Sequence, residues 1–248
     1  MLTVSGTARF VSDLHLRVDR PDLTQRFAAF LADTAAANVE SLFILGDLFE
    51  YWIGDDDLAD PFNEGVCNLL RSAADMGPRL YFMAGNRDFL LGDRFAAAAR
   101  LFLLDDSARV VVAGTPTLLL HGDTVCTDDL PYQEFRRTVR SPEWQERFLA
   151  RPLAERRAEV EALRRRSAEA MRAKSAETMD ANATAIRSVL EASHCTRLIH
   201  GHTHRPGRES LDLASGPGER WVLSDWDSAR GDALEIGPAG VRRLDLSA

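Results

Sequence analysis

Aspartate, asparagine and histidine recur in short clusters that could bind metal ions. In chain order the clusters are Asp13-Leu14-His15, Gly46-Asp47, Gly85-Asn86, His121 and His202-Thr203-His204. They supply two aspartates, one asparagine and four histidines, or seven nitrogen and oxygen ligands without a thiolate. This set is too large for one tetrahedral zinc ion and suits two borderline divalent ions such as Mn²⁺, Fe²⁺ or Zn²⁺. We therefore expect a dinuclear metal centre.

Each cluster directly follows a segment that is expected to form a β-strand. The expected strands are residues 9–12, 41–45, 79–84, 117–120 and 196–200. Helical spacing over residues 23–37 and 62–76 separates the first three strands. This alternation is typical of βαβ units and a largely parallel sheet. Sites in open α/β sheets form just beyond the carboxyl ends of the strands, so we expect the clusters to meet there.

Two of the clusters hold a pair of candidate ligands separated by one residue. Residues two apart in an extended chain point to the same side. We therefore expect Asp13 with His15, and His202 with His204, each to offer two ligands in one direction. Each cluster alone has a structural interpretation, such as a turn or a strand-end hydrogen bond. Five clusters in succession at strand ends are hard to explain in that way.

The composition and the predicted secondary structure of the chain change after a predicted hairpin. Residues 110–113 and 117–120 pair naturally around Gly114-Thr115-Pro116. From residue 131 to residue 182 the strand signals disappear and charge density rises, and Pro142 and Pro152 separate helical segments. A helix at 183–192 and several short strands complete the chain. We expect one α/β domain over residues 1–248 with a helical insertion at 131–182.

Composition excludes several classes of protein. The 248 residues are 45% hydrophobic and 27% charged, as in soluble globular proteins and unlike collagen, coiled coils or disordered chains. The sequence contains no apolar run of the roughly 20 residues that cross a bilayer. The N-terminus lacks the pattern of a signal peptide, so we expect no secretion by that route. Three scattered cysteines indicate a reducing compartment, and the net charge of −8 argues against a general nucleic-acid binder.

The ordered set Asp-x-His, Gly-Asp, Gly-Asn-x-Asp, His and Gly-His-x-His resembles the calcineurin-like metallophosphoesterases. Longer motifs are similar to one branch of that superfamily, the UDP-2,3-diacylglucosamine diphosphatases of lipid A biosynthesis. These motifs are residues 12–16, 45–50, 52–57, 85–92, 121–129 and 200–206. The resemblance covers nearly the whole chain. It implies a four-layer αββα sandwich with an inserted helical cap.

The resemblance also implies a site and a mechanism. The implied ligand sets are Asp13, His15 and His204 for one ion, Asn86, His121 and His202 for the other, and Asp47 as the bridge. The implied cofactors are two divalent metal ions, above all Mn²⁺. A hydroxide held by the ions would attack the pyrophosphate of UDP-2,3-diacylglucosamine and release UMP and 2,3-diacylglucosamine 1-phosphate. These seven residues and Arg87 are the expected catalytic residues.

The residue after the asparagine, here Arg87, distinguishes subclasses of phosphoesterase by whether it can protonate the leaving group. Many members of the superfamily place a histidine after the asparagine, where it can protonate a leaving alkoxide. An arginine cannot donate a proton near neutral pH, although it can bind phosphoryl oxygens through two hydrogen bonds. A phosphate leaving group, whose second pKa is ~6, departs without that proton. Arg87 therefore favours cleavage of a pyrophosphate over a simple alkyl phosphoester.

The insertion is basic in an acidic chain. Segment 151–174 holds eight cationic and four acidic side chains, and Lys174 is the only lysine of the chain. Apolar and cationic side chains share one helical stripe, which could hold an amphiphile; the alternative is a surface helix whose arginines extend over their neighbours. The resemblance gives substrate contacts at Asn86, Arg87, Asp129, Ser167, Lys174 and His202, with Arg164 as a further phosphate contact. Met171 stands where some relatives carry a polar residue.

The resemblance further implies peripheral attachment to the cytoplasmic face of the inner membrane, a lipid-linked UDP-sugar as substrate, and no nucleic-acid partner. Two other functions remain open. A broader metallophosphoesterase acting on nucleotides or phosphodiesters needs no apolar pocket. A catalytically silent binding scaffold typically loses ligands, whereas all seven are present here. Asp55, Asp56 and Asp57 could form a cation site or a solvated acidic turn, and we expect His200 to support its neighbours rather than bind metal.

Overall fold

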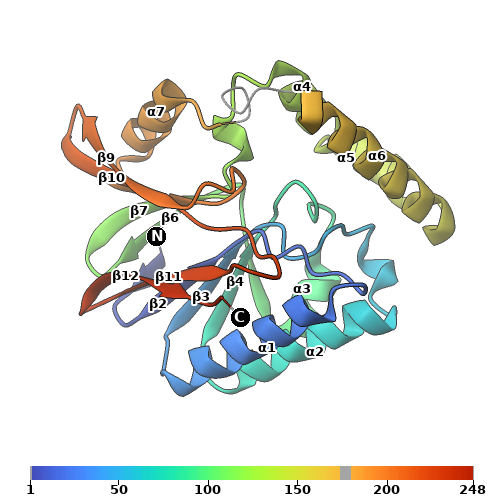
Figure 1. The fold of residues 1–248 in the computed structure, drawn as a ribbon, viewed down its shortest axis with the longest axis horizontal. Helices are drawn as coiled ribbons and strands as arrows, with labels where there is room; N and C mark the ends of the chain where they lie inside the picture. The colour runs from blue at the N-terminus through green and yellow to red at the C-terminus, as the bar shows by residue number, and fades with distance from the viewer. Residues whose placement is uncertain (1, 174–179, 248) are drawn as a thin grey trace.

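Two six-stranded β-sheets pack face to face between layers of helices (Figure 1). The structure, a computed structural model, describes residues 2–173 and 180–247. The first sheet has the order β1 (Leu2–Val4), β6 (Ser107–Val112), β7 (Thr115–Leu120), β8 (Arg197–His200), β10 (Gly216–Val222) and β9 (Gly207–Leu213). The second has the order β12 (Gly240–Asp245), β11 (Asp232–Gly237), β2 (Ala8–Val11), β3 (Ser41–Leu45), β4 (Arg79–Met83) and β5 (Leu101–Leu104).

Helices cover the outer face of each sheet. Helices α1 (Pro21–Ala36), α2 (Pro61–Asp75) and α3 (Asp93–Ala99) pack on the second sheet, and α7 (Ala183–Ser193) packs on the first (Figure 1). This arrangement confirms the four-layer αββα sandwich. Both sheets mix parallel and antiparallel pairs: β2 to β5 are parallel, whereas β11 and β12 are antiparallel additions.

The central strands are apolar on both faces because both faces are covered. Phe10, Phe43 and Tyr81 lie between the two sheets, and their rings stack with centroid distances of 4.9 Å and 4.8 Å. The residue that follows each of them in the sequence packs against α1–α3 instead. The strand ends are therefore fixed by packing on two sides, and so are the loops that leave them.

Three helices follow β7, and we call them the inserted helices: α4 (Leu130–Val139), α5 (Pro142–Leu149) and α6 (Leu153–Ala173). Asp129 caps α4 by accepting a hydrogen bond from the Tyr132 amide, and Ser141 caps α5 by accepting one from the Trp144 amide. Proline opens α5, where its missing N–H costs nothing. In Figure 1, α5 and α6 extend beyond the edge of the sandwich.

Helix α6 is tied to the sandwich by ion pairs with the loop after β3. The guanidinium of Arg156 is buried, donates to the Ile53 carbonyl at 2.6 Å and pairs with Asp56. Arg157 pairs with Asp57. Asp55 instead accepts hydrogen bonds from backbone amides at the start of α3 and from the Trp52 indole. The structure thus gives all three aspartates partners within the protein, although Asp56 also remains exposed to solvent.

The predicted elements match the structure with shifts of one to three residues at their ends. Strand β1 and helix α3 were not expected, because three and seven residues are too few to show a period. The hairpin turn lies at Ala113 and Gly114, both at positive φ, which is one residue earlier than predicted. Thr115 and Pro116 already belong to β7.

Candidate metal centre and adjoining cavity

All seven predicted ligands lie in loops that follow β2, β3, β4, β7 and β8. Two groups of side chains bring ligand atoms within 4.8 Å of one another: Asp13, His15 and His204 form one, and Asp13, Asp47 and His121 form the other. Nε2 of His204 lies 3.3 Å from Oδ1 of Asp13. The clusters therefore meet at one place, as the strand-end argument predicts.

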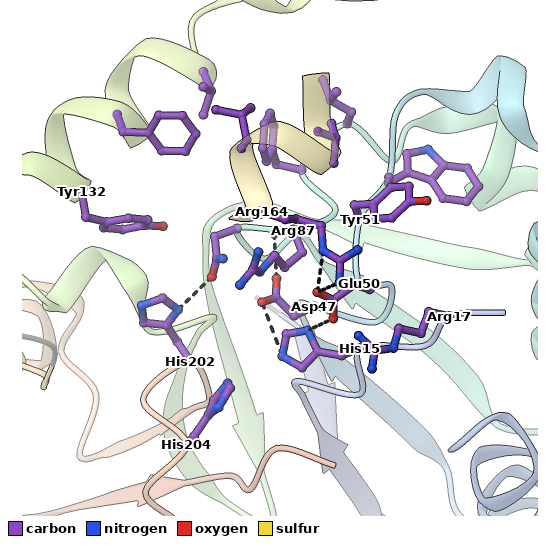
Figure 2. A pocket seen from close by; sticks show the side chains of 18 of the residues that line it. His15, Arg17, Asp47, Glu50, Tyr51, Arg87, Tyr132, Arg164, His202 and His204 are labelled. Atoms are coloured by element: carbon purple, nitrogen blue, oxygen red, sulfur yellow. Dashed lines mark hydrogen bonds and ion pairs between the residues drawn. The ribbon is translucent and has the colours of Figure 1, made fainter. Parts of the chain in front are cut away.

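Asn86 completes the second half of this cluster. Its Oδ1 lies 2.9 Å from Nε2 of His121 and 2.8 Å from Nδ1 of His202. Asp47 lies between the halves, with Oδ1 3.8 Å from His121 and Oδ2 4.0 Å from Nε2 of His15. Figure 2 shows His15, Asp47 and His202 around this cavity floor.

The expectation of extended geometry at the paired ligands is wrong. Five candidate ligands have left-handed backbone conformations, with φ of 54° at Asp13, 48° at His15, 53° at Asp47, 64° at His202 and 53° at His204. His202 and His204 consequently turn to different groups: His202 faces Asn86, and His204 faces Asp13. Strained backbone of this kind concentrates at functional sites.

Two glycines allow the loops to approach so closely. A Cβ at Gly85 would lie 2.1 Å from Oδ1 of Asp47, and a Cβ at Gly201 would lie 2.2 Å from Oδ2 of Asp13. Buried Asp88 holds the β3 and β4 loops together, because it accepts hydrogen bonds from the amides of Gly85 at 2.8 Å and Leu48 at 2.7 Å. Sterics therefore explain why glycine stands at positions 85 and 201: a side chain at either position would collide with a carboxylate of the cluster.

Burial and charge shift the protonation of the cluster. Burial lowers the pKa of His202 to about 4, so its imidazole is neutral at pH 7 and can act as a ligand. Burial and the charge of Asp13 raise the pKa of Asp47 to about 6. Burial opposes the charge of His121, but the neighbouring carboxylates, led by Asp47, outweigh it and raise the pKa of His121 to about 9. These values describe the protein without metal.

A cavity of about 750 Å³ opens above the cluster. Its polar floor includes His15, Asp47, Asn86, His202 and His204. Its apolar wall comes largely from the inserted helices and includes Phe135, Val139, Trp144, Phe148, Val160 and Leu163. A single cavity therefore offers both charged and apolar surface.

The structure places some of the predicted substrate contacts at the cavity but not all of them. Arg87, Asp129 and Arg164 line the cavity. Arg164 pairs with Glu50, its Nη2 lying 2.8 Å from Oε1. Ser167 lies on α6, while Lys174 is outside the described residues.

Sequence reasoning missed Glu50 and Tyr132, which both lie at this site. Glu50 lies beside His15, and the Tyr132 ring packs against the His202 imidazole at 5.8 Å between centroids. The signal for Glu50 was its place at the end of the motif of residues 45–50, three residues after Asp47. As expected, His200 contacts neighbouring protein groups: its Nε2 accepts a hydrogen bond from Arg220 at 2.9 Å.

Comparisons with known proteins agree with this geometry. Residues 8–206 match the family model of the calcineurin-like phosphoesterases. The chain is 48% identical over 220 residues to a UDP-2,3-diacylglucosamine hydrolase of Aromatoleum aromaticum, with 89% of each chain covered. It is 44% identical over 241 residues to a protein of the same name from Chromobacterium violaceum, covering 96% of this chain and 98% of that one. These proteins are relatives along almost their full length.

Solved structures share the fold at low sequence identity. A dimetal phosphatase from Danio rerio superposes with a TM-score of 0.52 at 13% identity, covering 98% of each chain. An archaeal phosphodiesterase gives 0.50 at 11% identity and covers 96% of this chain and 99% of that one. Among the described residues, every helix is too short or too polar to cross a bilayer.

Proposed function

Since the chain belongs to the calcineurin-like phosphoesterase family, we propose that it cleaves the pyrophosphate bond of UDP-2,3-diacylglucosamine in lipid A biosynthesis. The products are UMP and 2,3-diacylglucosamine 1-phosphate. One observation carries the proposal beyond the names of the relatives: the cavity joins a cluster of metal-binding side chains to an apolar wall. A substrate with a diphosphate and two acyl chains needs both surfaces, whereas a nucleotide alone needs only the first.

The donor set fits divalent metal ions. Nε2 of His15 is buried and makes no hydrogen bond within the described residues, so it is available to a metal ion. We propose two ions, with Asp13, His15 and His204 holding one, Asn86, His121 and His202 holding the other, and Asp47 shared. Oxygen and imidazole donors without thiolate suit Mn²⁺, which we propose as the cofactor. Such ions supply a nucleophile from water at neutral pH and offset phosphoryl charge.

Arg87 binds the phosphates in this proposal. Its side chain lines the cavity, and its Nε is buried without a hydrogen-bond partner among the described residues. Its backbone amide donates to Oδ1 of Asp47 at 2.8 Å, which fixes the arginine next to the cluster. Since it cannot act as an acid, it supports a leaving group that departs as a phosphate.

We propose that residues 131–182 form a cap inserted in a single domain of residues 1–248. Arg164, Ser167 and Lys174 are its proposed substrate contacts, with Asp129 just before it and Asn86, Arg87 and His202 below. A guanidinium has five N–H donors, so the ion pair of Arg164 with Glu50 is compatible with a phosphate contact. The apolar wall holds the acyl chains.

We also propose peripheral association with the cytoplasmic face of the inner membrane, without a nucleic-acid partner. Exposed apolar side chains on the inserted helices support this proposal: Leu130 is 71% exposed, and Phe135 and Leu149 are exposed on α4 and α5. Apolar side chains of this kind can enter the boundary between headgroups and acyl chains. The net charge of −8 disfavours binding to nucleic acid.

Product analysis in ¹⁸O-labelled water tests the proposed reaction. Purified protein with Mn²⁺ is expected to convert UDP-2,3-diacylglucosamine to UMP and the lipid 1-phosphate, and a chelator is expected to stop the conversion. Label in UMP would indicate attack at the nucleotide-side phosphorus. Survival of this substrate while an aryl phosphodiester is cleaved would establish the broader metallophosphoesterase instead.

A further inference from the structure

The imidazole of His15 lies between two carboxylates that approach its two different nitrogens. Nε2 is 4.0 Å from Oδ2 of Asp47, on the side of the ligand cluster. Nδ1 is 3.5 Å from Oε2 of Glu50, on the other side. Figure 2 draws both contacts as dashed lines from the His15 ring, one to Asp47 and one to Glu50. One nitrogen therefore faces the proposed metal centre, and the other faces a carboxylate outside the ligand set.

The backbone fixes Glu50 next to His15. The loop after β2 and the loop after β3 run side by side: the His15 amide donates to the Asp47 carbonyl at 2.9 Å, and the Glu50 amide donates to the Leu16 carbonyl at 3.1 Å. A bridge between Leu16 and Phe49 lies between these two bonds. Glu50 is therefore held in register with His15 by main-chain hydrogen bonds.

The other oxygen of Glu50 is held by the inserted helices. Oε1 accepts a hydrogen bond from Nε of Arg164 at 3.0 Å and lies 2.8 Å from its Nη2 in an ion pair. The Arg164 guanidinium in turn lies over the Tyr51 ring, 5.6 Å from its centroid. These contacts hold Oε1 in place and join α6 to His15 through a single side chain.

We propose that Glu50 is a positioning residue for His15. Its carboxylate, 3.5 Å from Nδ1, favours the tautomer with the proton on Nδ1 and so leaves Nε2 unprotonated and aimed at the cluster, while Arg164 holds the other carboxylate oxygen. A neutral imidazole carries its proton on only one nitrogen, and a carboxylate partner on the far nitrogen sets the tautomer and raises the basicity of the ligand. The inference rests on the proposed metal centre.

A second role for Glu50 must be separated from this one, because its ion pair also ties α6 to the sandwich. Asp56 offers a matched control. It pairs with Arg156 of the same helix, yet it neither lines the cavity nor contacts a candidate ligand in the described residues. A variant at Asp56 therefore loosens α6 without touching His15.

The test compares Glu50→Gln, Arg164→Gln and Asp56→Asn in the full-length protein. In metal-free protein, ¹⁵N NMR of the histidine rings, assigned with His15→Gln, is expected to show His15 protonated at Nδ1 in the wild type and in Asp56→Asn. Glu50→Gln is expected to change this tautomer. Mn²⁺ affinity is expected to fall about 10- to 100-fold in Glu50→Gln, as for other outer-shell partners, less in Arg164→Gln, and less than about twofold in Asp56→Asn.

Two results would overturn the inference: an unchanged His15 tautomer with unchanged Mn²⁺ affinity in Glu50→Gln, or equal losses of affinity in Glu50→Gln and Asp56→Asn. The second would show that Glu50 only holds α6. Failure of the wild-type protein to bind Mn²⁺ would contradict the proposed function instead. The tautomer measurement would still decide the role of Glu50 in that case.

Discussion

The floor and the wall of the cavity are built in opposite ways. On the floor, carboxylate, imidazole and amide groups from five loops converge, and several atoms, such as both nitrogens of His15, make no hydrogen bond in the described residues. On the inserted helices, three cations of α6 already have carboxylate partners: Arg156 pairs with Asp56, Arg157 with Asp57, and Arg164, which lines the cavity, with Glu50. The floor is thus arranged for an external ligand, whereas much of the basic charge of the insertion stabilises the protein itself.

This difference changes the interpretation of the arginine-rich segment. The sequence left open whether this segment holds an amphiphile or is a surface helix whose arginines extend over their neighbours, and buried Arg156 in fact donates to the Ile53 carbonyl and Asp56. Specificity for a lipid then depends on the apolar residues between the arginines, such as Val160 and Leu163, which line the cavity.

Asp47→Asn is expected to have the largest effect because it removes the carboxylate that both halves of the cluster share. We expect kcat on UDP-2,3-diacylglucosamine to fall by more than the roughly 100-fold that loss of an outer-shell partner costs. Steady-state kinetics with added Mn²⁺ would measure this. Asp56→Asn is the control, because it makes the same change from carboxylate to amide outside the cluster. It is expected to keep most of the activity. Comparable losses in both variants would contradict the assignment of Asp47.

Arg87→Ala is expected to lower kcat/KM about 100-fold, the effect of removing one donor to transition-state charge. Arg87→Lys is expected to recover only part of that loss, because lysine keeps the charge but not the two-pronged geometry. Kinetics of both variants on the diphosphate substrate would measure the difference. Wild-type activity in Arg87→Ala would show that this arginine does not bind the phosphates.

Metal affinity is expected to rise with pH between 7 and 9. The raised pKa of His121, about 9, means that the imidazole carries a proton at pH 7 in the metal-free protein. A metal ion binds only the neutral ring, so binding releases this proton, and affinity increases up to about tenfold per pH unit for each proton released. Titrations at several pH values, with Asp56→Asn as control, would measure the slope. A flat profile above pH 7 would show that the carboxylates do not hold His121 charged.

Arg156→Gln is expected to destabilise the attachment of α6 by about 1–2 kcal/mol, a value reduced because Asp56 is 48% exposed. Hydrogen exchange of the α6 amides would detect this loosening, while the sandwich amides stay protected. Arg151→Gln is the matched control, because Arg151 lies at the surface just before α6 and pairs there with Glu155 and Glu159; it is expected to change the exchange of the α6 amides less than Arg156→Gln does. Faster exchange throughout the sandwich in Arg156→Gln would show that α6 is not attached independently.

The positions of the ligands could be predicted from the sequence, but the backbone conformations that aim them could not. Strands such as β3 and β4 are continuous apolar segments, and the ligand residue types follow them directly. The left-handed φ of His15 and His202 has no such signature, because histidine adopts it only where the surrounding loops enforce it. The extended-chain argument therefore grouped His202 with His204, although the loops turn them apart.

The partners of charged side chains could not be predicted either. Arg156 and Asp56 are separated by 100 residues, as are Arg157 and Asp57, and nothing in either segment indicates its partner. Local spacing therefore identifies candidate ligands better than it identifies long-range ion pairs. Glu50 was overlooked for the same reason, since its contacts to His15 and Arg164 arise only when three segments meet.

Anomalous X-ray diffraction from crystals soaked in Mn²⁺ tests the central claim most directly. The account predicts two peaks on the cavity floor, one among Asp13, His15 and His204 and the other among Asn86, His121 and His202, with Asp47 contacting both. A single peak, or peaks outside this cluster, would contradict the dinuclear centre.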